Sequence, residues 1–326
     1  MKRSIFLLMA ALSLFSTPVL AQKAVLTGGQ NGAYHSTFCP PLPAVLSQHD
    51  FPNYKCTTSE GTLDNIKQVL AKPSNIGFVQ LDVFARESQA HPEYAQQLTI
   101  IRKDIACEGL WAVTKNTSIT NFGDLLGRRR TPYLIANGGS AASFAFLQSV
   151  DPDGLGRAKN IRVAANATEV INTVAASQDN VVGFFVQWAN PENNNIKLMV
   201  DKGLNVVPVV SREVQSAKVN GEDVYSVQEF NLTASGFISN GKTVISACTP
   251  VALITGNPDA QKDRDAKDDQ RDLIKAVREI PSSALLPQES KLAALMKSVR
   301  VVSGSALNEM LAAADKAKKA AEQLSN

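Results

Sequence analysis

The feature that most constrains the fold is a local pattern that occurs three times: a short strand, a turn rich in glycine and small hydroxyl residues, and a helix. The pattern lies at residues 26–34, 57–83 and 135–144. Repeated strand–turn–helix units are typical of a parallel sheet, because each helix carries the chain back to begin the next strand in the same direction. We therefore expect an open, largely parallel α/β sheet.

The second copy of this pattern is the most informative one. Small hydroxyl residues surround Gly61 just before apolar residues at helical spacing, which predicts a hydroxyl-rich cap on a helix over residues 63–70. A strand over residues 76–79 follows and ends at Gln80 and Asp82. A helix N-terminus can bind a carboxylate or phosphate through its free N–H groups, so we interpret this turn as a candidate anion site; a plain helix cap is the alternative.

The first copy contains a glycine loop, residues 28–34, between a strand and a helix. The loop fits neither the dinucleotide fingerprint GxGxxG nor a nucleotide P-loop, so no cofactor is expected. Its glycines would allow the backbone to approach a ligand closely, and a plain tight turn is the alternative.

The rest of the chain continues the alternation of strands and helices. Further strands are expected at residues 24–27, 51–57, 98–101, 108–114, 133–136, 161–164, 181–186, 206–210, 243–247 and 251–255. Further helices are expected at residues 83–88, 121–127, 144–150, 169–177, 273–280 and 306–323. The sequence also predicts a hairpin over residues 219–223 and a charged, solvated connection over residues 259–272.

The N-terminus is predicted to be a secretory signal peptide over residues 1–21. Lys2 and Arg3 precede a short apolar run, and small residues precede Gln22. The run is too short for a membrane span, so we expect a soluble, exported, periplasmic protein. Without Lys2 and Arg3 the 33 basic residues become 31 against 30 acidic ones, and the formal net charge falls from +3 to +1. This balance gives no electrostatic reason to expect nucleic-acid binding.

The spacing of the four cysteines, Cys39, Cys56, Cys107 and Cys248, includes no CxxC motif, and no histidine lies at metal-site spacing from them. No metal is therefore expected. In an exported protein an even number favours disulfides. An alternative is an enzyme with a Cys39 nucleophile, because His35 lies four residues away on a possible helix face. Pro40 and Pro41 interrupt such a helix, which makes this alternative the weaker one.

Five segments resemble the solute-binding subunit of a tripartite ATP-independent periplasmic (TRAP) transporter of the TAXI type. They read GGQNGAYH, SEGTLDNIKQVLAKPSNIGFVQLDV, DLLGRRR, GGSAASFAFLQ and CTPVALIT, beginning at residues 28, 59, 124, 138 and 248. The second segment is the most specific, since Gly61-Thr62, Asn65 and Gln80-x-Asp82 stand where that family shows Gly-Ser, Asn and Gln-x-Asp. The chain departs from the family at residues 139–142, where Gly-Ser-Ala-Ala replaces Gly-Ser-Gly-Thr.

The resemblance implies an α/β periplasmic-binding-protein fold of type II kind, with two α/β domains around a ligand cleft, joined by crossing hinge strands. Residues 22–107 and 249–326 would form a discontinuous first domain, and residues 108–248 the second. The ligand-binding residues would be Gly29, Gln30, Asn31, Gly32, Ala33, Tyr34, Gly61, Thr62, Asn65, Gln80 and Asp82 from the first domain, and Gly139, Ser140, Ala141, Gln187 and Trp188 from the second. Asp82 would orient the loop or accept a ligand amine, with a helix cap as the alternative.

The function implied by the resemblance is capture of a small organic anion, such as an amino acid or dicarboxylate, and its delivery to a TRAP-type permease. No arginine lies inside a motif that faces the cleft, so backbone dipoles would bind the anion. We expect no enzymatic activity, a monomer, and domains that close over the ligand. A binding protein that reports to a sensor kinase is the alternative in the same fold.

The implied crossing of the chain between the domains also predicts the disulfides. Segments 101–107 and 248–255 would run side by side as the crossing strands, which places Cys107 opposite Cys248. Neighbouring antiparallel strands can supply the Cα separation that a disulfide needs. Cys39 and Cys56 would then pair inside the first domain.

Overall fold

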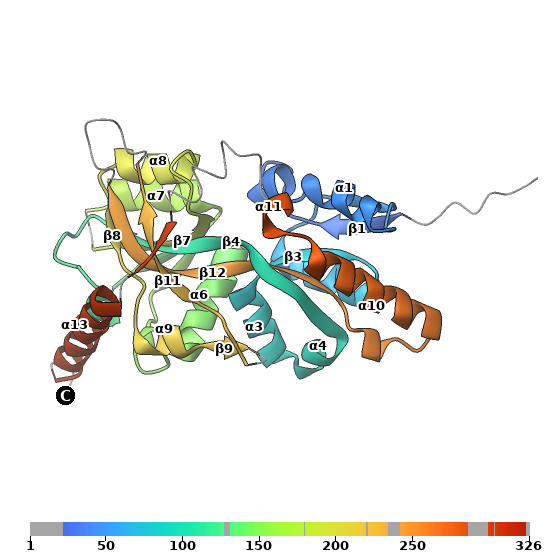
Figure 1. Cartoon of the computed structure of the whole chain (residues 1–326). Helices are drawn as coiled ribbons and strands as arrows, with labels where there is room; N and C mark the ends of the chain where they lie inside the picture. Colours follow the sequence, from blue (N-terminus) through green and yellow to red (C-terminus); the bar gives the residue numbers. More distant parts are fainter. Residues whose placement is uncertain are drawn as a thin grey trace, which may run out of the picture.

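Two long strands, β4 (Leu98–Thr114) and β12 (Thr243–Gly256), run through both halves of the molecule in the computed structural model (Figure 1). The structure describes residues 22–126, 131–178, 180–219, 221–233, 242–285, 299–302 and 304–323. The predicted signal peptide lies outside the described residues, as do the arginines at positions 128–130. Among the described residues, no helix is both long enough and apolar enough to cross a bilayer.

The first half is a small parallel sheet with helices on its faces. Its parallel strands are β1 (Lys23–Leu26), β2 (Tyr54–Thr57) and β3 (Ile76–Gln80). Its helices are η1 (Tyr34–Phe38), α1 (Pro41–Gln48), α2 (Thr62–Ala71), α3 (Leu81–Ala90), α4 (Pro92–Gln97), η3 (Pro258–Ala260), α10 (Arg264–Glu279) and α11 (Ser282–Leu285). All five residues of β3 are buried, as expected of a strand covered on both faces.

The second half repeats this plan. Its parallel strands are β5 (Tyr133–Ala136), β6 (Ile161–Ala164) and β7 (Val182–Trp188). Further strands are β8 (Asn205–Val207), β9 (Lys218–Val219), β10 (Glu222–Asp223), β11 (Ser226–Asn231) and β13 (Val299–Val301). Its helices are α5 (Phe122–Leu126), α6 (Gly139–Val150), η2 (Leu155–Arg157), α7 (Ala167–Ala176), α8 (Asn194–Asp201), α9 (Arg212–Ser216) and α13 (Gly304–Gln323).

The strand order joins the halves into one sheet, β2-β1-β3-β12-β4-β7-β5-β6. β12 is the antiparallel strand in the first half, where it pairs with β3, and β4 is the antiparallel strand in the second half, where it pairs with β7. Each half is therefore a parallel α/β unit completed by a strand that crosses from the other half. This is the arrangement of the type II periplasmic-binding-protein fold, so the predicted fold class is confirmed.

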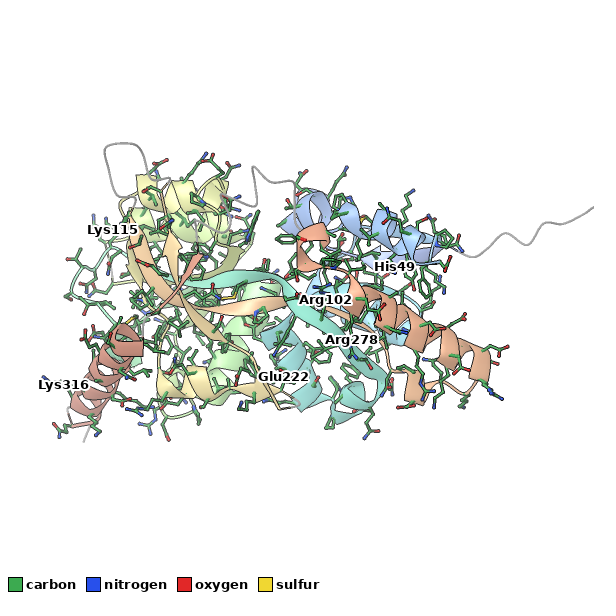
Figure 2. The ribbon with its side chains drawn as sticks, in the orientation of Figure 1. His49, Arg102, Lys115, Glu222, Arg278 and Lys316 are labelled. Atoms are coloured by element: carbon green, nitrogen blue, oxygen red, sulfur yellow. A yellow bond between two sulfur atoms is a disulfide. The ribbon has the colours of Figure 1, made fainter. Side chains whose placement is uncertain are left out.

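One crossing strand differs from the prediction. The sequence predicted two strands, at residues 98–101 and 108–114, separated by a polar break, whereas the structure has the single strand β4. Arg102 and Asp104 lie at that break, yet β4 runs through it without interruption, and Arg102 contacts the helices of the first half (Figure 2). The guanidinium group of Arg102 donates hydrogen bonds to the carbonyl oxygens of Val277 and Ile280 at 3.1 and 2.7 Å. A charged side chain that bonds to helix ends is compatible with a strand, although it breaks the apolar pattern.

The segment over residues 259–272 was predicted to be a solvated connection, and most of it is instead the start of α10. Asp263 caps this helix by accepting a hydrogen bond from the backbone N–H of Ala266 at 2.8 Å. The charged residues form the exposed face, while Gln270, Leu273 and Val277 are buried at helical spacing. The prediction failed because dense charge obscured the narrow apolar face.

Both predicted disulfides are confirmed. Cys39 is bonded to Cys56 in the first half, and Cys107 is bonded to Cys248 between the crossing strands. Cys107 lies opposite Pro250 in the β4–β12 register, next to the Gly109–Cys248 pair. All four cysteines are therefore bonded, which removes the thiol that the alternative cysteine-dependent enzyme would need.

The last helix, α13, packs against the second half, as Figure 1 shows. The Lys318 ammonium group lies 3.0 Å from Asp151 and 2.8 Å from Glu213, and Arg212 pairs with Asp315. The predicted domain limits assign residues 249–326 to the first domain. Those limits remain a proposal, and α13 would have to be counted with the second domain.

Candidate functional site

A cavity of about 230 Å³ lies where the two halves meet. The cavity receives the ends of β1 and β3 and the start of α2 from the first half, and the start of α6 from the second. Its lining residues are Thr27, Gly28, Gly32, Ala33, Tyr34, Gly61, Thr62, Gln80, Glu108, Asn137, Gly139, Ser140, Val186 and Gln187. A cavity built from both halves can be opened or closed by their relative movement.

The N-terminus of α2 forms one wall of the cavity. Its N-cap is Gly61, whose φ of +93° favours glycine, and no side chain caps the helix. The predicted hydroxyl cap is therefore wrong: Thr62 is the first helical residue, and its hydroxyl accepts a hydrogen bond from the N–H of Gln80 at 3.2 Å. The first turn of α2 is thus fixed to the end of β3. No side chain accepts hydrogen bonds from its backbone N–H groups, so a ligand could accept them.

The N-terminus of α6 forms the facing wall in the same way. Its N-cap is Gly138, with a φ of +72° and no side-chain cap, and the helix begins at Gly139, five residues earlier than predicted. The hydroxyl of Ser140 accepts a hydrogen bond from the N–H of Val186 on β7 at 2.9 Å. Each half therefore presents a helix start that has glycine at the N-cap position and no side-chain cap, and whose hydroxyl residue is bonded to the adjacent strand.

Side-chain capping varies among the helices of the described residues: four α-helices are capped by their own side chains, whereas α1, α3 and α4 are not. Asn166, Asn193, Ser211 and Asp263 accept hydrogen bonds from the first turns of α7, α8, α9 and α10. The two helices that begin at the cavity lack this feature. Free N–H groups and the helix dipole make both starts suitable for an anionic group.

The glycine loop contributes its first residue, Gly28, and its last three residues to the cavity. Gly29, Gln30 and Asn31 are exposed and do not line it, whereas Gly32, Ala33 and Tyr34 do. The ring of Tyr34 stacks on that of Phe78 with centroids 5.5 Å apart. The end of β3 therefore holds the tyrosine at the cavity.

Asn65 and Asp82 lie behind the cavity wall. The side-chain amide of Asn65 donates to the carbonyl oxygens of Thr27 and Phe78, both at 2.8 Å, and so ties α2 to β1 and β3. Asp82 is fully buried; one carboxylate oxygen accepts from its neighbour Val83 at 2.8 Å and the other from the hydroxyl of Tyr225 at 3.1 Å. Burial raises the pKa of Asp82 to about 6 despite these hydrogen bonds.

The remaining predicted residues divide between the cavity and its surroundings. Gln80, Gly139 and Gln187 line it together with Gly61, Thr62 and Ser140. Ala141 does not line it, and Trp188 packs edge-on against Phe38 at 5.2 Å. Thr27, Gly28, Asn137, Val186 and Glu108 line the cavity and were not predicted.

Glu108 is the most consequential of the residues that sequence reasoning missed. It lies on β4 opposite Thr249 of β12 and Trp188 of β7, at the centre of the crossing strands. Its side chain is 8% exposed, and its Oε2 accepts a 2.8 Å hydrogen bond from the hydroxyl of Tyr34. Burial raises the pKa of Glu108 to about 7, and hydrogen bonds from Tyr34 and Gln80 oppose this rise.

The lining residues carry no positive charge. The residues that surround the cavity in the described part of the chain include no lysine, arginine or histidine. Among the described residues no group of three or more histidine, cysteine, aspartate and glutamate side chains could hold a metal ion. A ligand would thus meet backbone dipoles, hydroxyls, amides and one carboxyl group.

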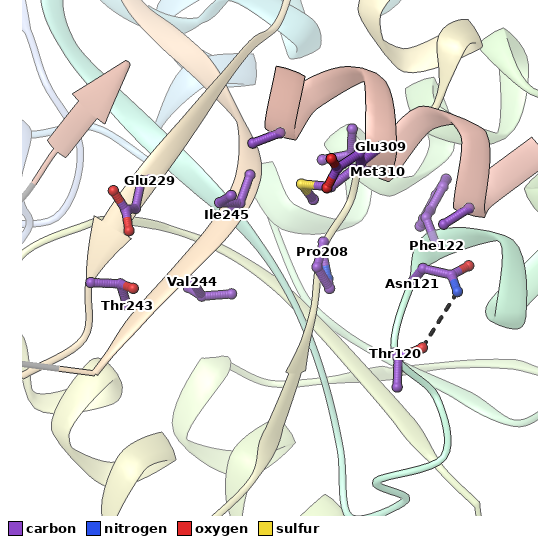
Figure 3. Close-up of a pocket in the computed structure, with 13 residues that line it drawn as sticks. Thr120, Asn121, Phe122, Pro208, Glu229, Thr243, Val244, Ile245, Glu309 and Met310 are labelled. Carbon is purple, nitrogen blue, oxygen red and sulfur yellow. Dashed lines mark hydrogen bonds between the residues drawn. The ribbon is translucent and has the colours of Figure 1, made fainter. Parts of the chain in front are cut away.

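A larger cavity of about 560 Å³ lies between α13, the strands β11 and β12, and the segment after β8 (Figure 3). Figure 3 shows Met310 and Glu309 on the helix side and Ile245 on the strand side. All its lining residues belong to the second half and α13, so movement of the two halves would not enclose it. The smaller cavity is the candidate site.

Three comparisons with known proteins show what the chain is similar to. No protein-family model matches the chain, and no curated protein matches it in sequence. Among solved structures, the GluR0 ligand-binding core in complex with L-glutamate is similar, with 13% identity, a TM-score of 0.45, and coverage of 79% of this chain and 93% of that one. A periplasmic transporter has 11% identity, a TM-score of 0.44, and coverage of 93% and 96%.

A third similar structure is the VFT2 domain of BvgS from Bordetella pertussis. It has 13% identity and a TM-score of 0.41, with coverage of 85% of this chain and 92% of that one. Likenesses of this size carry no information about the ligand or the partner of this chain.

Proposed function

We propose that this protein binds a small carboxylate-bearing solute outside the cytoplasm and delivers it to a membrane permease of the TRAP type, as the TAXI resemblance implies. The observation that supports this most is the pair of uncapped helix starts, α2 from one half and α6 from the other, at one cavity. Their N–H groups and adjacent hydroxyls can satisfy the oxygens of a carboxylate without a cationic side chain.

Binding would be coupled to closure of the two halves. The hydroxyl of Thr62 and that of Ser140 come from opposite halves, so a ligand that contacts both is bound fully only when the halves approach each other. The long strands β4 and β12 would bend at the crossing, and the Cys107–Cys248 disulfide would keep them paired. No bond of the ligand would be made or broken.

Calorimetric titration with carboxylates, amino acids and neutral sugars tests the ligand class. We expect binding of one or more carboxylates, and Thr62→Ala should weaken it by about 1.5 to 3 kcal/mol, as for one lost hydrogen bond to a charged group. Ser140→Ala should act similarly, whereas Ser149→Ala is the matched control, because this serine on the same helix is exposed and its hydroxyl donates to the carbonyl of Phe146, away from the cavity lining. Binding confined to neutral sugars would refute the proposal.

Two further measurements test closure and delivery. Small-angle scattering should show a smaller radius of gyration at saturating ligand, and an unchanged radius would contradict closure. Co-purification from membranes should recover permease subunits; recovery of a sensor kinase in their place would reassign the partner while leaving ligand capture intact.

A further inference from the structure

Glu108 is a buried carboxyl group at the cavity with no cation beside it. It makes no ion pair with any lysine, arginine or histidine among the described residues, and its neighbours there are the hydroxyl of Tyr34 and the amide of Gln80. Asp82, a second buried carboxyl, lies close enough to raise its pKa further. A buried carboxylate without a cationic partner is costly, so the empty site favours the protonated form.

The two sides of the cavity therefore have opposite electrostatic character. The starts of α2 and α6 favour negative charge, whereas Glu108, on the crossing strand β4, favours positive charge once it is ionised. Asp82 adds negative potential on the side of Glu108 but is closed off from the cavity by Tyr225 and the start of α3. A ligand that matches both sides carries a carboxylate and an ammonium group on a small skeleton.

We propose that the site selects a zwitterionic amino acid, whose carboxylate lies at the starts of α2 and α6 and whose ammonium group is bound by Glu108. This inference rests on the proposed function and narrows its ligand class. Glu108, rather than Asp82, is then the acceptor of the ligand amine. Tyr34 and Gln80 act as positioning residues that hold the carboxyl group of Glu108 toward the cavity.

Matched ligand pairs test this selection. Each of a set of L-amino acids is titrated into the protein beside the acid of the same skeleton that lacks the ammonium group, for example L-glutamate beside glutarate. We expect the tightest ligand to be an amino acid and its counterpart to bind roughly 10- to 100-fold more weakly. In Glu108→Gln this ratio should fall toward one, whereas Glu93→Gln, an exposed control on α4, should preserve it.

Proton linkage tests the same selection in the unmodified protein, so it decides the matter if Glu108→Gln does not fold. At pH 6.5 an amino acid should release protons on binding, because its ammonium group lowers the pKa of Glu108 from about 7. Calorimetry in two buffers of different ionisation enthalpy measures this release.

The possible outcomes separate the two proposals. Equal or tighter binding of the acids without an ammonium group, an unchanged ratio in a folded Glu108→Gln, or proton uptake with an amino acid would overturn this inference and leave carboxylate capture standing. Binding of neither member of any pair would overturn the proposed function and this inference with it.

Discussion

The hydroxyl of Tyr34 donates a 2.8 Å hydrogen bond to Oε2 of Glu108, which lies 74 residues later in the chain. This bond joins the glycine loop of the first half to the strand that crosses between the halves. It is the main polar contact of a carboxyl group whose pKa is raised by burial; it partly opposes that rise and directs the group to the candidate site. The position of Tyr34 in the loop therefore affects the protonation of Glu108 and hence the charge at the cavity.

Removal of this hydroxyl should make ligand binding more dependent on pH. Tyr34→Phe keeps the ring that stacks on Phe78 but removes a hydrogen bond that favours the ionised form of Glu108, so the pKa of Glu108 should rise. We expect affinity for an amino acid to fall roughly 3- to 10-fold at pH 7 and to recover at pH 8.5. Calorimetric titrations between pH 6 and pH 8.5 measure this, and a pH profile parallel to that of the unmodified protein would contradict it.

The ligand-free protein should become more stable on mild acidification. The pKa of Glu108 is raised to about 7 and that of Asp82 to about 6, so the folded state binds more protons than the unfolded state between about pH 4 and pH 7. The stability from these groups is complete below pH 4 and is lost as the pH rises through 6 to 7. Glu108 alone should contribute at most about 3 kcal/mol to this change.

Urea denaturation at pH 5 and pH 8 measures this difference. Glu108→Gln removes one of the two titrating groups, so its free energy of unfolding should change less between the two values. A variant with the same pH dependence as the unmodified protein would show that Glu108 does not titrate in this range.

Gly139 and Gln80 meet across the two halves. A Cβ atom at position 139 would lie 2.0 Å from Oε1 of Gln80, so Gly139→Ala must displace the end of this flexible side chain. We expect the fold to be retained and ligand affinity to fall roughly tenfold, because Gln80 can no longer support Glu108.

A double-mutant cycle tests this contact. Once Gln80→Ala has removed the amide, Gly139→Ala should have little further effect on affinity. Strictly additive losses in binding free energy would show that Gly139 acts through another contact.

The two disulfides should differ in their contribution to stability. The Cys107–Cys248 bond closes a loop with a sequence separation of 141, and the Cys39–Cys56 bond one of 17. In the chain-entropy model, replacing the first pair with alanine should lower the free energy of unfolding by about 5 kcal/mol, and replacing the second by about 3 kcal/mol. Urea denaturation of the two double variants compares them, and a larger loss for the shorter loop would contradict the model.

The sequence alone determined the local units of the fold. The strand–glycine turn–helix pattern predicted α2 and α6 and the strands before them, because glycine in a left-handed turn and apolar spacing act within a few residues. Resemblance to a family supplied the pairing of the two crossing segments and hence both cysteine pairs. Charge misled the prediction at α10, where one narrow apolar face was sufficient for a helix.

Only the tertiary structure decided what these units do at the cavity. In sequence Glu108 was only the first residue of a predicted strand, and Asp82 was expected to orient the loop, to accept a ligand amine or to cap a helix. Packing of the halves brings Tyr225 from the second half onto Asp82, while Tyr34 from the first half holds Glu108 at the cavity. The charge that a buried carboxyl group carries depends on neighbours that are distant along the chain, so no local pattern could predict it.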